Sequence, residues 1–340
     1  AEHWAKSDLH AIRTRIAEGE AAYREQRYVT AQNIYLETSQ RVERLMAKVP
    51  DIVSGLLDAG RQALEDGEIH FTTALSREHM GRLKNVRKLF APGNSTGSLY
   101  LNTSKPGLDH VQVRQAICSG IDRYALASIA YQNTAAFTAR GILPPAMGSH
   151  RDGHVYNPEA AKASLQPYLD RLDRPLRLLT VWGARPYLPE PVQTAEQLVR
   201  MLERLGLQVD VVPTANNTEY FDILRANDYD MVLGGWIADS PSLAMFLTVM
   251  LDPAMVPTND RAPLATANLS RYKDETGHEL LRAYCDNPSD ETLHAFLDHV
   301  AADAPMMPLM YGASVAAHRW EVKGYEPGTF PEFSSLSLSE

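Results

Sequence analysis

Residues 228–239 have the sequence DYDMVLGGWIAD, which carries the clearest signal of an α/β sheet in the chain. Its short apolar run is typical of a buried strand. The glycine pair that follows allows the backbone to bend where the strand ends, which places Trp236 and Asp239 at the carboxyl edge of the strand. Open α/β sheets bind their ligands at that edge. The stretch therefore predicts both a sheet and the place where that sheet carries a binding site.

The neighbouring segments alternate between strand and helix patterns. Residues 98–101 form another short apolar run of the strand type. Residues 176–181, 191–205 and 207–212 have the pattern of a strand–helix–strand unit, in which Gly206 is placed to end the helix. Such alternation predicts an α/β architecture whose sheets are largely covered by helices.

Two helix starts are indicated by capping residues. Asn157 comes directly before Pro158, so we expect Asn157 to cap a helix that has proline in its first turn. Asp109 is expected to cap another helix, whose apolar face includes Val113 and Ile117. In each case the side-chain oxygen would accept a hydrogen bond from a backbone N–H group that the first helical turn leaves unpaired.

Composition and charge narrow the class of protein. The chain has 340 residues, enough for two domains with separate cores. Its formal net charge is -9, and the positive charges are scattered among acids, which argues against the clustered basic face that nucleic-acid binding requires. No run approaches the roughly 18 consecutive apolar residues that a membrane-spanning helix needs. We therefore expect no nucleic-acid partner and no membrane span.

The chain lacks the signatures of catalysis and of metal binding. It has no Walker loop, no G-x-G-x-x-G motif and no H-E-x-x-H motif, so it is not predicted to be an enzyme, and we expect neither cofactor nor metal. The two cysteines, Cys118 and Cys285, have no metal-ligand neighbour at short spacing. They are either two buried thiols that act as small apolar side chains or one long-range disulfide, and the sequence leaves both open.

Residues 1–58 have a strongly helical composition, with no proline before Pro50. Small and aromatic residues recur there at short offsets that let two antiparallel helices pack small against large: Gly19, Ala22, Tyr23, Tyr28, Ala31 and Tyr35. The pattern resembles one tetratricopeptide hairpin, although a stable array needs about three repeats. A tetratricopeptide-like hairpin and a plain amphipathic helical pair both remain open. No signal segment is present, and Ala1 is consistent with a mature exported chain and with a cytosolic one.

A series of segments, taken in order, resembles a known family. These segments lie at 63–71, 99–106, 111–117, 120–123, 141–145, 156–162, 205–209 and 228–236. In their order and spacing they are similar to the extracytoplasmic solute-binding proteins of family 5, which serve oligopeptide, dipeptide and nickel ABC importers. The similarity extends from about residue 60 to about residue 325 and carries more weight than any single segment.

The resemblance implies a two-lobed fold of the periplasmic-binding-protein type, class II, with an incomplete first lobe. Residues 1–58 would form the helical N-terminal segment, and 106–305 the ligand-binding lobe. Residues 59–105 and 306–330 would form the remnant of the first lobe with the crossover strands, and 331–340 a tail.

The resemblance also implies ligand contacts. In relatives that bind peptides, the acid after the Gly-Trp pair contacts the amino terminus of the ligand, and it corresponds to Asp239. Trp236 would form an apolar wall beside it. Tyr100, Asn102 and Tyr311 lie near the implied crossovers and are further candidates. Other roles stay open: Asp239 as a helix cap or a solvated acid, Trp236 in the core, Asn102 bonded to backbone groups, and the two tyrosines as core residues.

The function implied is that of a solute-binding protein of an ABC importer, which captures a peptide or similar amine-bearing solute by lobe closure. Its partners would be that solute and the membrane subunits of the importer, in the periplasm or attached to the outer leaflet of the membrane. An alternative stays open because the first lobe is incomplete. The chain would then use a binding-protein fold as a sensor domain or as a structural subunit of a larger assembly, held through the N-terminal helices.

Overall fold

A computed structural model describes residues 5–73, 77–131, 137–145, 147–148, 151–172, 174–258, 267–326 and 333–339. The chain divides into two compact units. The first comprises residues 1–88, 316–323 and 337–340, and the second comprises residues 89–315 and 324–336. Each unit has a cluster of buried apolar side chains of its own.

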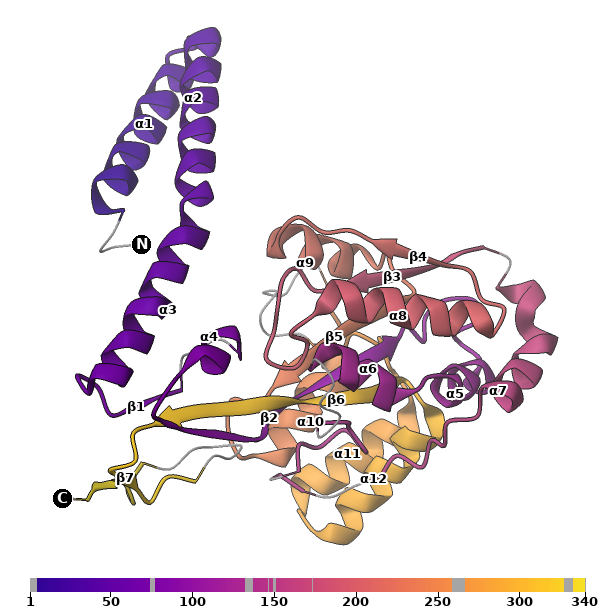
Figure 1. The fold of residues 1–340 in the computed structure, drawn as a ribbon. Coiled ribbons are helices and arrows are strands. Elements are labelled where there is room, and N and C mark those ends of the chain that lie inside the picture. Colours follow the sequence, from indigo (N-terminus) through magenta and orange to yellow (C-terminus); the bar gives the residue numbers. More distant parts are fainter. Residues whose placement is uncertain are drawn as a thin grey trace. The chain divides into compact units, whose positions relative to one another are not determined.

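The first unit begins with the helices α1 (Lys6–Arg24), α2 (Tyr28–Ala47) and α3 (Val49–Asp66), followed by the short α4 (Arg77–Arg82) (Figure 1). Helices α1 and α2 form an antiparallel hairpin. Its contact is small against large: a Cβ atom added to Gly19 would lie 2.8 Å from Cε1 of Tyr35. Gly67 ends α3 in the left-handed region, with a φ of 83°, where glycine is favoured because it has no Cβ.

Short strands complete the first unit. Strand β1 (Phe71–Thr72) pairs antiparallel with the last residues of β6 (Met306–His318). Strand β7 (Val322–Lys323) pairs antiparallel with β8 (Ser337–Leu338), which lies within the segment expected to be a tail.

The second unit is built on a mixed sheet with the strand order β6–β2–β5–β3–β4. Strand β2 (Arg87–Leu101) is antiparallel to β5 (Met231–Ile237). Strand β3 (Leu176–Thr180) is parallel to both β5 and β4 (Val209–Val212). Because β3 and β5 run in the same direction, their carboxyl ends reach the same edge of the sheet.

The strand–helix–strand unit predicted from the sequence is confirmed. It consists of β3, helix α8 (Pro191–Arg204) and the parallel strand β4. Gly206 follows the helix with a φ of 95°, and its N–H donates to the carbonyl of Glu203 at 2.9 Å. The predicted α/β architecture is therefore present in this unit.

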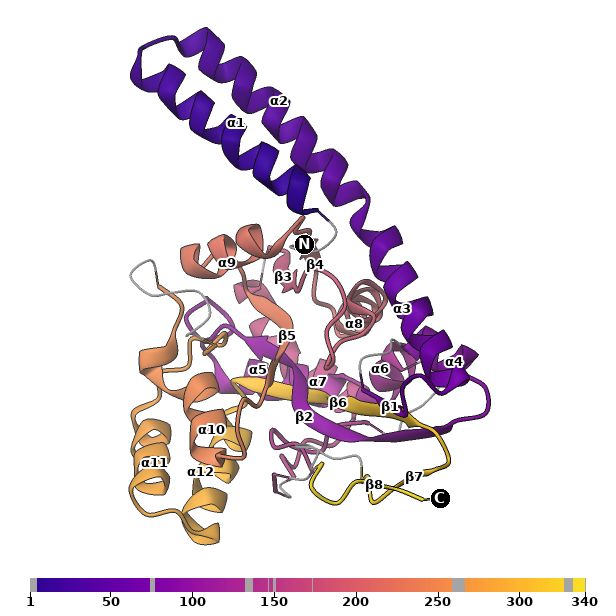
Figure 2. The same cartoon turned by 90° about the vertical axis from the view of Figure 1, so that its left-hand side faces the viewer.

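The remaining helices of the second unit cover this sheet. Helix α8, with α5 and α6, lies on one side of the sheet, and α10, α11 and α12 lie on the other (Figures 1 and 2). Their bounds are α5 (Val111–Gly120), α6 (Arg123–Ala130), α7 (Pro158–Leu165), α9 (Asn217–Ala226), α10 (Leu243–Leu251), α11 (Glu275–Asp286) and α12 (Asp290–Asp303), with 3₁₀ turns at Gln166–Arg171 and Pro253–Met255.

One of the two predicted caps is confirmed and the other is wrong. The side chain of Asn157 accepts a hydrogen bond from the Ala160 N–H at the start of α7. Asp109 does not cap α5, which begins at Val111 with His110 in the cap position. The backbone before α5 is already bonded in a turn of its own, because the Asp109 N–H donates to the carbonyl of Lys105 at 2.9 Å.

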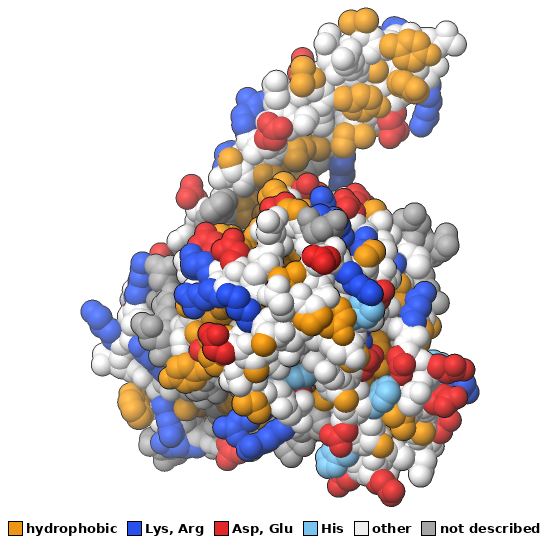
Figure 3. Space-filling model, turned by 90° about the vertical axis from the view of Figure 1, so that its right-hand side faces the viewer, with side chains coloured by type: hydrophobic (Ala, Val, Ile, Leu, Met, Phe, Trp, Pro, Cys, Tyr) orange, Lys and Arg blue, Asp and Glu red, His pale blue; other side chains and the backbone are white. Residues whose placement is uncertain are grey.

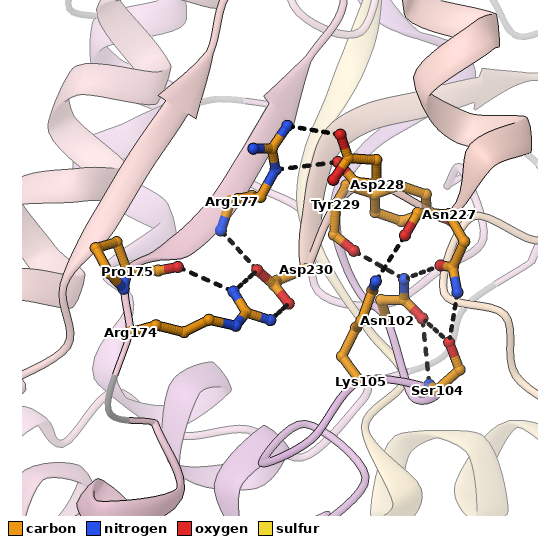
Figure 4. Close-up of polar contacts among 10 residues, drawn as sticks. All are labelled: Asn102, Ser104, Lys105, Arg174, Pro175, Arg177, Asn227, Asp228, Tyr229 and Asp230. Carbon is orange, nitrogen blue, oxygen red and sulfur yellow. Dashed lines mark hydrogen bonds and ion pairs between the residues drawn. The ribbon is translucent and has the colours of Figure 1, made fainter.

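A buried polar cluster joins the amino-terminal ends of β3 and β5 to the end of β2 (Figure 4). The Asp230 side chain is almost fully buried and accepts two hydrogen bonds from the Arg174 guanidinium, both at 2.7 Å, and one from the Arg177 N–H at 2.8 Å. Asn102, immediately after β2, donates to the carbonyl of Tyr229 at 2.9 Å and to Oδ1 of Asn227 at 2.7 Å. These bonds fix the sheet at the edge opposite the carboxyl ends of β3 and β5.

Candidate functional site

A pocket of about 490 Å³ opens at the carboxyl ends of β3 and β5. Its walls come from the loop after β3, from one face of α9, and from the end of β5. The lining residues are Val181, Arg185, Tyr187, Asn217, Tyr220, Phe221, Leu224, Gly235, Trp236, Ile237, Asp239, Ala267 and Leu269. The predicted site residues Trp236 and Asp239 are thus part of one concave surface, at the edge where α/β sheets bind ligands.

Asp239 presents a free carboxylate to this pocket. Its side chain is exposed, and within the described part of the chain it has no hydrogen-bond or ion-pair partner. The helix that follows is capped by Ser242, whose Oγ accepts from the Met245 N–H at 3.3 Å. The alternative that Asp239 caps this helix is therefore wrong, which leaves its charge available to a ligand.

Arg185 brings a positive charge to the same pocket. It is half-buried, and its Nη2 donates to Oδ1 of Asn217 at 2.8 Å, which holds the guanidinium toward α9. Sequence reasoning missed this residue. It is the one basic residue between the end of β3 and the start of α8, so the rule that places ligands beyond parallel strand ends could have found it.

The remainder of the wall is aromatic and neutral. Tyr187 and Tyr220 are buried, Trp236 is half-buried, and the ring centroids of Tyr220 and Phe221 lie 5.4 Å apart. Burial raises the pKa of the Tyr187 hydroxyl, an effect that the nearby Arg185 guanidinium partly offsets, and burial also raises the pKa of Tyr220 well above its usual range. Both hydroxyls therefore stay protonated near neutral pH, and the acidic and basic side chains that line the pocket are Asp239 and Arg185.

Comparison with known proteins identifies the family. The family model described as bacterial extracellular solute-binding proteins, family 5 Middle, matches residues 57–255, which is more than half of the chain. The chain belongs to family 5 of the bacterial extracellular solute-binding proteins. The predicted family is thereby confirmed.

Individual relatives agree with the family match. The dipeptide-binding protein of Escherichia coli K12 is 27% identical over 264 residues, which is 75% of this chain and 48% of that protein. Two solved structures have a similar fold. HbpA2 from Haemophilus parasuis gives a TM-score of 0.72 at 20% identity and covers 84% of this chain and 56% of that one. A dipeptide binding protein from Pseudoalteromonas sp. SM9913, in complex with Met-Leu, gives 0.63 at 21% identity and covers 83% and 56%.

These values confirm the periplasmic-binding-protein-like fold predicted from the sequence. The chain spans about half the length of the curated relatives it matches. No helix among the described residues is long and apolar enough to cross a membrane.

The other predicted contacts of this family 5 protein lie elsewhere. Tyr100 is fully buried, and its hydroxyl lies 3.8 Å from the sulfur of Met250. Asn102 is buried in the polar cluster of Figure 4. The Tyr311 hydroxyl accepts from the Arg140 N–H at 3.1 Å. None of the three lines the pocket that contains Asp239, and each bonds to protein groups instead.

A second cavity, of about 470 Å³, lies between α6 and the segment around residue 152. Its wall contains an ion pair between Arg123 and Asp152, at 2.7 Å, which is largely buried. Cys118 also lines this cavity as a free thiol, and burial raises its pKa to about 12. Cys285 is free and exposed, so the disulfide alternative is wrong, and the expectation of two buried thiols holds only for Cys118.

Proposed function

We propose that this protein captures a small peptide-like solute with a free amine and a free carboxylate, in the pocket that contains Asp239 and Arg185. The observation that carries the proposal is the presence of one unpaired carboxylate and one guanidinium on the wall of a single aromatic pocket. A zwitterionic solute would match both charges, whereas a solute with one charge would leave the other unmatched.

The chemistry of each contact supports this assignment. The Asp239 carboxylate can accept a charge-assisted hydrogen bond from an ammonium group, and Arg185 can bind a carboxylate through two parallel N–H donors. Hydrogen bonds of this kind contribute roughly 1.5–3 kcal/mol each. Trp236 and Tyr187 would contact the apolar part of the solute, and an indole face also tolerates a neighbouring cation.

The size of the pocket limits the solute. Ligand pockets range from about 300 to about 1,000 Å³, and the volume of about 490 Å³ is in the lower half of that range. It suits a solute of the size of a dipeptide or tripeptide better than a long peptide.

The proposal extends to transport. The family is extracellular, and relatives are dipeptide-binding and peptide-transport proteins. We place this protein outside the cytoplasm, where it would deliver its solute to the membrane subunits of an ABC importer after lobe closure. Binding without catalysis is part of the proposal, because the G-x-S-x-G match at Gly93–Gly97 lies inside strand β2 and not at the turn from a strand into a helix that a nucleophilic serine of this motif requires.

Isothermal titration calorimetry with the dipeptide Met-Leu tests this function. The protein should bind Met-Leu and should lose about tenfold in affinity when either end is blocked, as in N-acetyl-Met-Leu or Met-Leu amide. In Asp239→Asn the penalty for the acetyl group should shrink, while the penalty for the amide remains. Equal affinity for free and blocked peptides, or no binding to any of them, would overturn the proposal.

A second candidate function is a structural role in a larger assembly, and one observation favours it. Exposed apolar side chains follow α2 and α3 at spacings of three, four and seven residues, which is the pattern of a helix that packs against another helix. They are Tyr28, Tyr35, Val42, Met46, Val53 and Leu56. Figure 3 shows hydrophobic side chains gathered along the helical hairpin.

Light scattering on the intact protein distinguishes assembly through these helices from solute capture without assembly. If the helices mediate assembly, the protein should elute as an oligomer, and Val53→Glu with Leu56→Glu should make it monomeric. Glu43→Gln, an exposed change on α2 outside this row of side chains, should leave the oligomer intact. A monomeric wild-type protein would exclude self-assembly through these helices.

A further inference from the structure

The loop that carries Arg185 passes over glycine residues on three neighbouring strands. Gly312, Gly97 and Gly235 lie on β6, β2 and β5, which are adjacent in the sheet, and Gly97 and Gly235 are paired directly. Between β3 and α8, residues 186 and 187 pass over these glycines. Gly97, Gly235 and Gly312 are called the glycine seat below.

At Gly97 and Gly235 the loop lies too close for any side chain, and at Gly312 it leaves little room. A Cβ atom added to Gly97 would lie 2.4 Å from the carbonyl oxygen of Tyr187. One added to Gly235 would lie 2.5 Å from Cδ2 of the Tyr187 ring and 2.5 Å from the carbonyl oxygen of Thr96. One added to Gly312 would first meet Oγ of Ser95 and would lie 3.1 Å from the carbonyl oxygen of Pro186. Distances below about 3 Å are not tolerated without a shift, and at Gly97 the obstructing atom is backbone.

The loop is also held from outside the seat. The Tyr131 hydroxyl lies 3.0 Å from the carbonyl oxygen of Pro186 and 2.8 Å from that of Tyr311, so it joins the loop to β6. Within the loop, Arg185 and Leu188 exchange two backbone hydrogen bonds of 2.9 Å. Arg185 is therefore carried by a tight turn whose next two residues are fixed on the sheet.

From these contacts we infer that the glycine seat is a positioning and specificity device for the solute carboxylate. The inference rests on the proposed function, in which Arg185 binds that carboxylate. Gly235 also lines the pocket, but the role inferred for the three glycines is to fix the height of the Tyr187 segment above the sheet, and hence the position of the Arg185 guanidinium relative to Asp239. Asp239 follows β5, the strand that contains Gly235 of the seat, so the seat relates both charged groups to the same strand. The distance between the Arg185 guanidinium and the Asp239 carboxylate then determines which spacing of amine and carboxylate in a solute the pocket accepts.

The substitution Gly97→Ala tests the seat directly. The added methyl group should lift the segment at Tyr187, so the variant should lose its preference for a free carboxylate. The quantity measured is the ratio of affinities for Met-Leu and Met-Leu amide, which we expect to fall about tenfold from its wild-type value. A merely structural effect would weaken both peptides equally and leave this ratio unchanged.

The matched control is Gly234→Ala, one residue before Gly235 on β5. Its added Cβ would meet its nearest neighbours, Oη of Tyr220 and Cγ1 of Val232, at an ordinary 3.5 Å. This variant should keep the wild-type ratio. If Gly97→Ala does not fold, Tyr131→Phe loosens the same loop by removing only a hydroxyl, and it should lower the ratio in the same direction.

Hydrogen exchange supplies a readout that needs no ligand. The amide protons of Arg185 and Leu188 should exchange about tenfold faster in Gly97→Ala than in the wild type or in Gly234→Ala. If wild-type protein binds no dipeptide, the proposed function fails while the seat is still tested by this exchange. Unchanged exchange at both amides in Gly97→Ala and in Tyr131→Phe would overturn the inference. If the wild-type protein prefers the free carboxylate, an affinity ratio in Gly97→Ala equal to that of the wild type would also overturn it.

Discussion

Asp230 and Asp239 are carboxylates at opposite ends of the same strand, and their surroundings give them opposite roles. Asp230 precedes β5 and is buried with three donors from Arg174 and Arg177, whereas Asp239 follows β5, is exposed and has no partner among the described residues. The sequence pattern around β5 contains both acids and cannot separate them. The pairing of Asp230 with Arg174, which is 56 residues away in the chain, is what identifies Asp230 as a structural residue.

Replacement of Asp230 should measurably lower the stability of the fold. In Asp230→Ala the partly buried backbone N–H of Arg177 loses its acceptor, and half of the Arg174 side chain is already exposed, so Arg174 can recover its hydration. The free energy of unfolding should fall by about 2–3 kcal/mol. Urea denaturation measures the change. Asp228→Ala, which breaks an exposed pair with Arg177, should cost less than about 1 kcal/mol, and equal losses in the two variants would contradict this account.

Arg185 shows why part of the site was missed. Trp236 and Asp239 belong to the stretch at 228–239 that signals the sheet, so the sequence predicted them together with β5. Arg185 is on a different loop, and its relation to Asp239 depends on β3 lying beside β5 in the sheet. A pattern within one segment does not contain that pairing. Tyr100 and Asn102 were chosen by nearness to an implied crossover, and the direction of a side chain relative to a sheet is not fixed by nearness in sequence.

Helix bounds and caps were predicted correctly where they depend only on residues close together in the sequence. The helix bounds of α8 and the left-handed glycine after it follow from apolar spacing and from the preference of glycine for positive φ. The cap of α7 at Asn157 is equally local. The cap expected at Asp109 failed because the turn before α5 has its own hydrogen bonds, made with residues that no helical periodicity describes.

A contact between helices α11 and α12 makes the stability of the protein depend on pH. Asp274 caps α11 by accepting from the Gly277 N–H at 2.6 Å, and it bonds His299 of α12 at 2.7 Å. Burial alone would raise the pKa of this carboxyl, but the hydrogen bonds from Gly277 and His299 outweigh burial and lower the pKa below its ordinary value. Its stabilising effect is therefore complete above the unfolded pKa and is lost as the pH falls through the lower, folded value.

Thermal unfolding as a function of pH checks this assignment. At pH 7, Asp274→Asn should melt at a lower temperature than the wild type, since an amide is a weaker acceptor for both donors. Below pH 4 the gap should narrow, because the Asp274 carboxyl of the unfolded wild type becomes protonated there and that of the folded protein follows at lower pH. A gap that stays constant from pH 7 to pH 3 would show that the ionised carboxyl is not what joins α11 to α12.

At the scale of the whole molecule, the division between the two units falls within β2 and within β6. A change of composition along the sequence does not locate a boundary that lies inside a strand. The sequence therefore predicted the helical N-terminal segment and the α/β lobe, but the assignment of residues 59–105 and 306–330 to a first-lobe remnant stays a prediction.

The two units should respond differently to a solute. A ligand that binds only the folded second unit stabilises that unit by about 2.7 kcal/mol at a concentration one hundred times its Kd. Met-Leu at that level should therefore slow hydrogen exchange in α9 and β5 and leave α1 and α2 unchanged. Exchange measured with mass spectrometry resolves these segments, and N-acetyl-Met-Leu serves as the control. Equal slowing in both units would contradict a site confined to the second unit.

The order of strands has a consequence for how this chain is made. Strand β2 is one of the first elements of the second unit, but its neighbour β6 is the last, and the backbone bond between Leu101 and Pro305 closes the sheet. During synthesis the edge of β2 that pairs with β6 therefore has no partner until Met306–His318 have left the ribosome. Contacts between such distant positions form slowly, and an unpaired strand edge can join another chain in the meantime. The nascent chain is therefore most exposed to wrong strand pairing between the synthesis of β2 and that of β6.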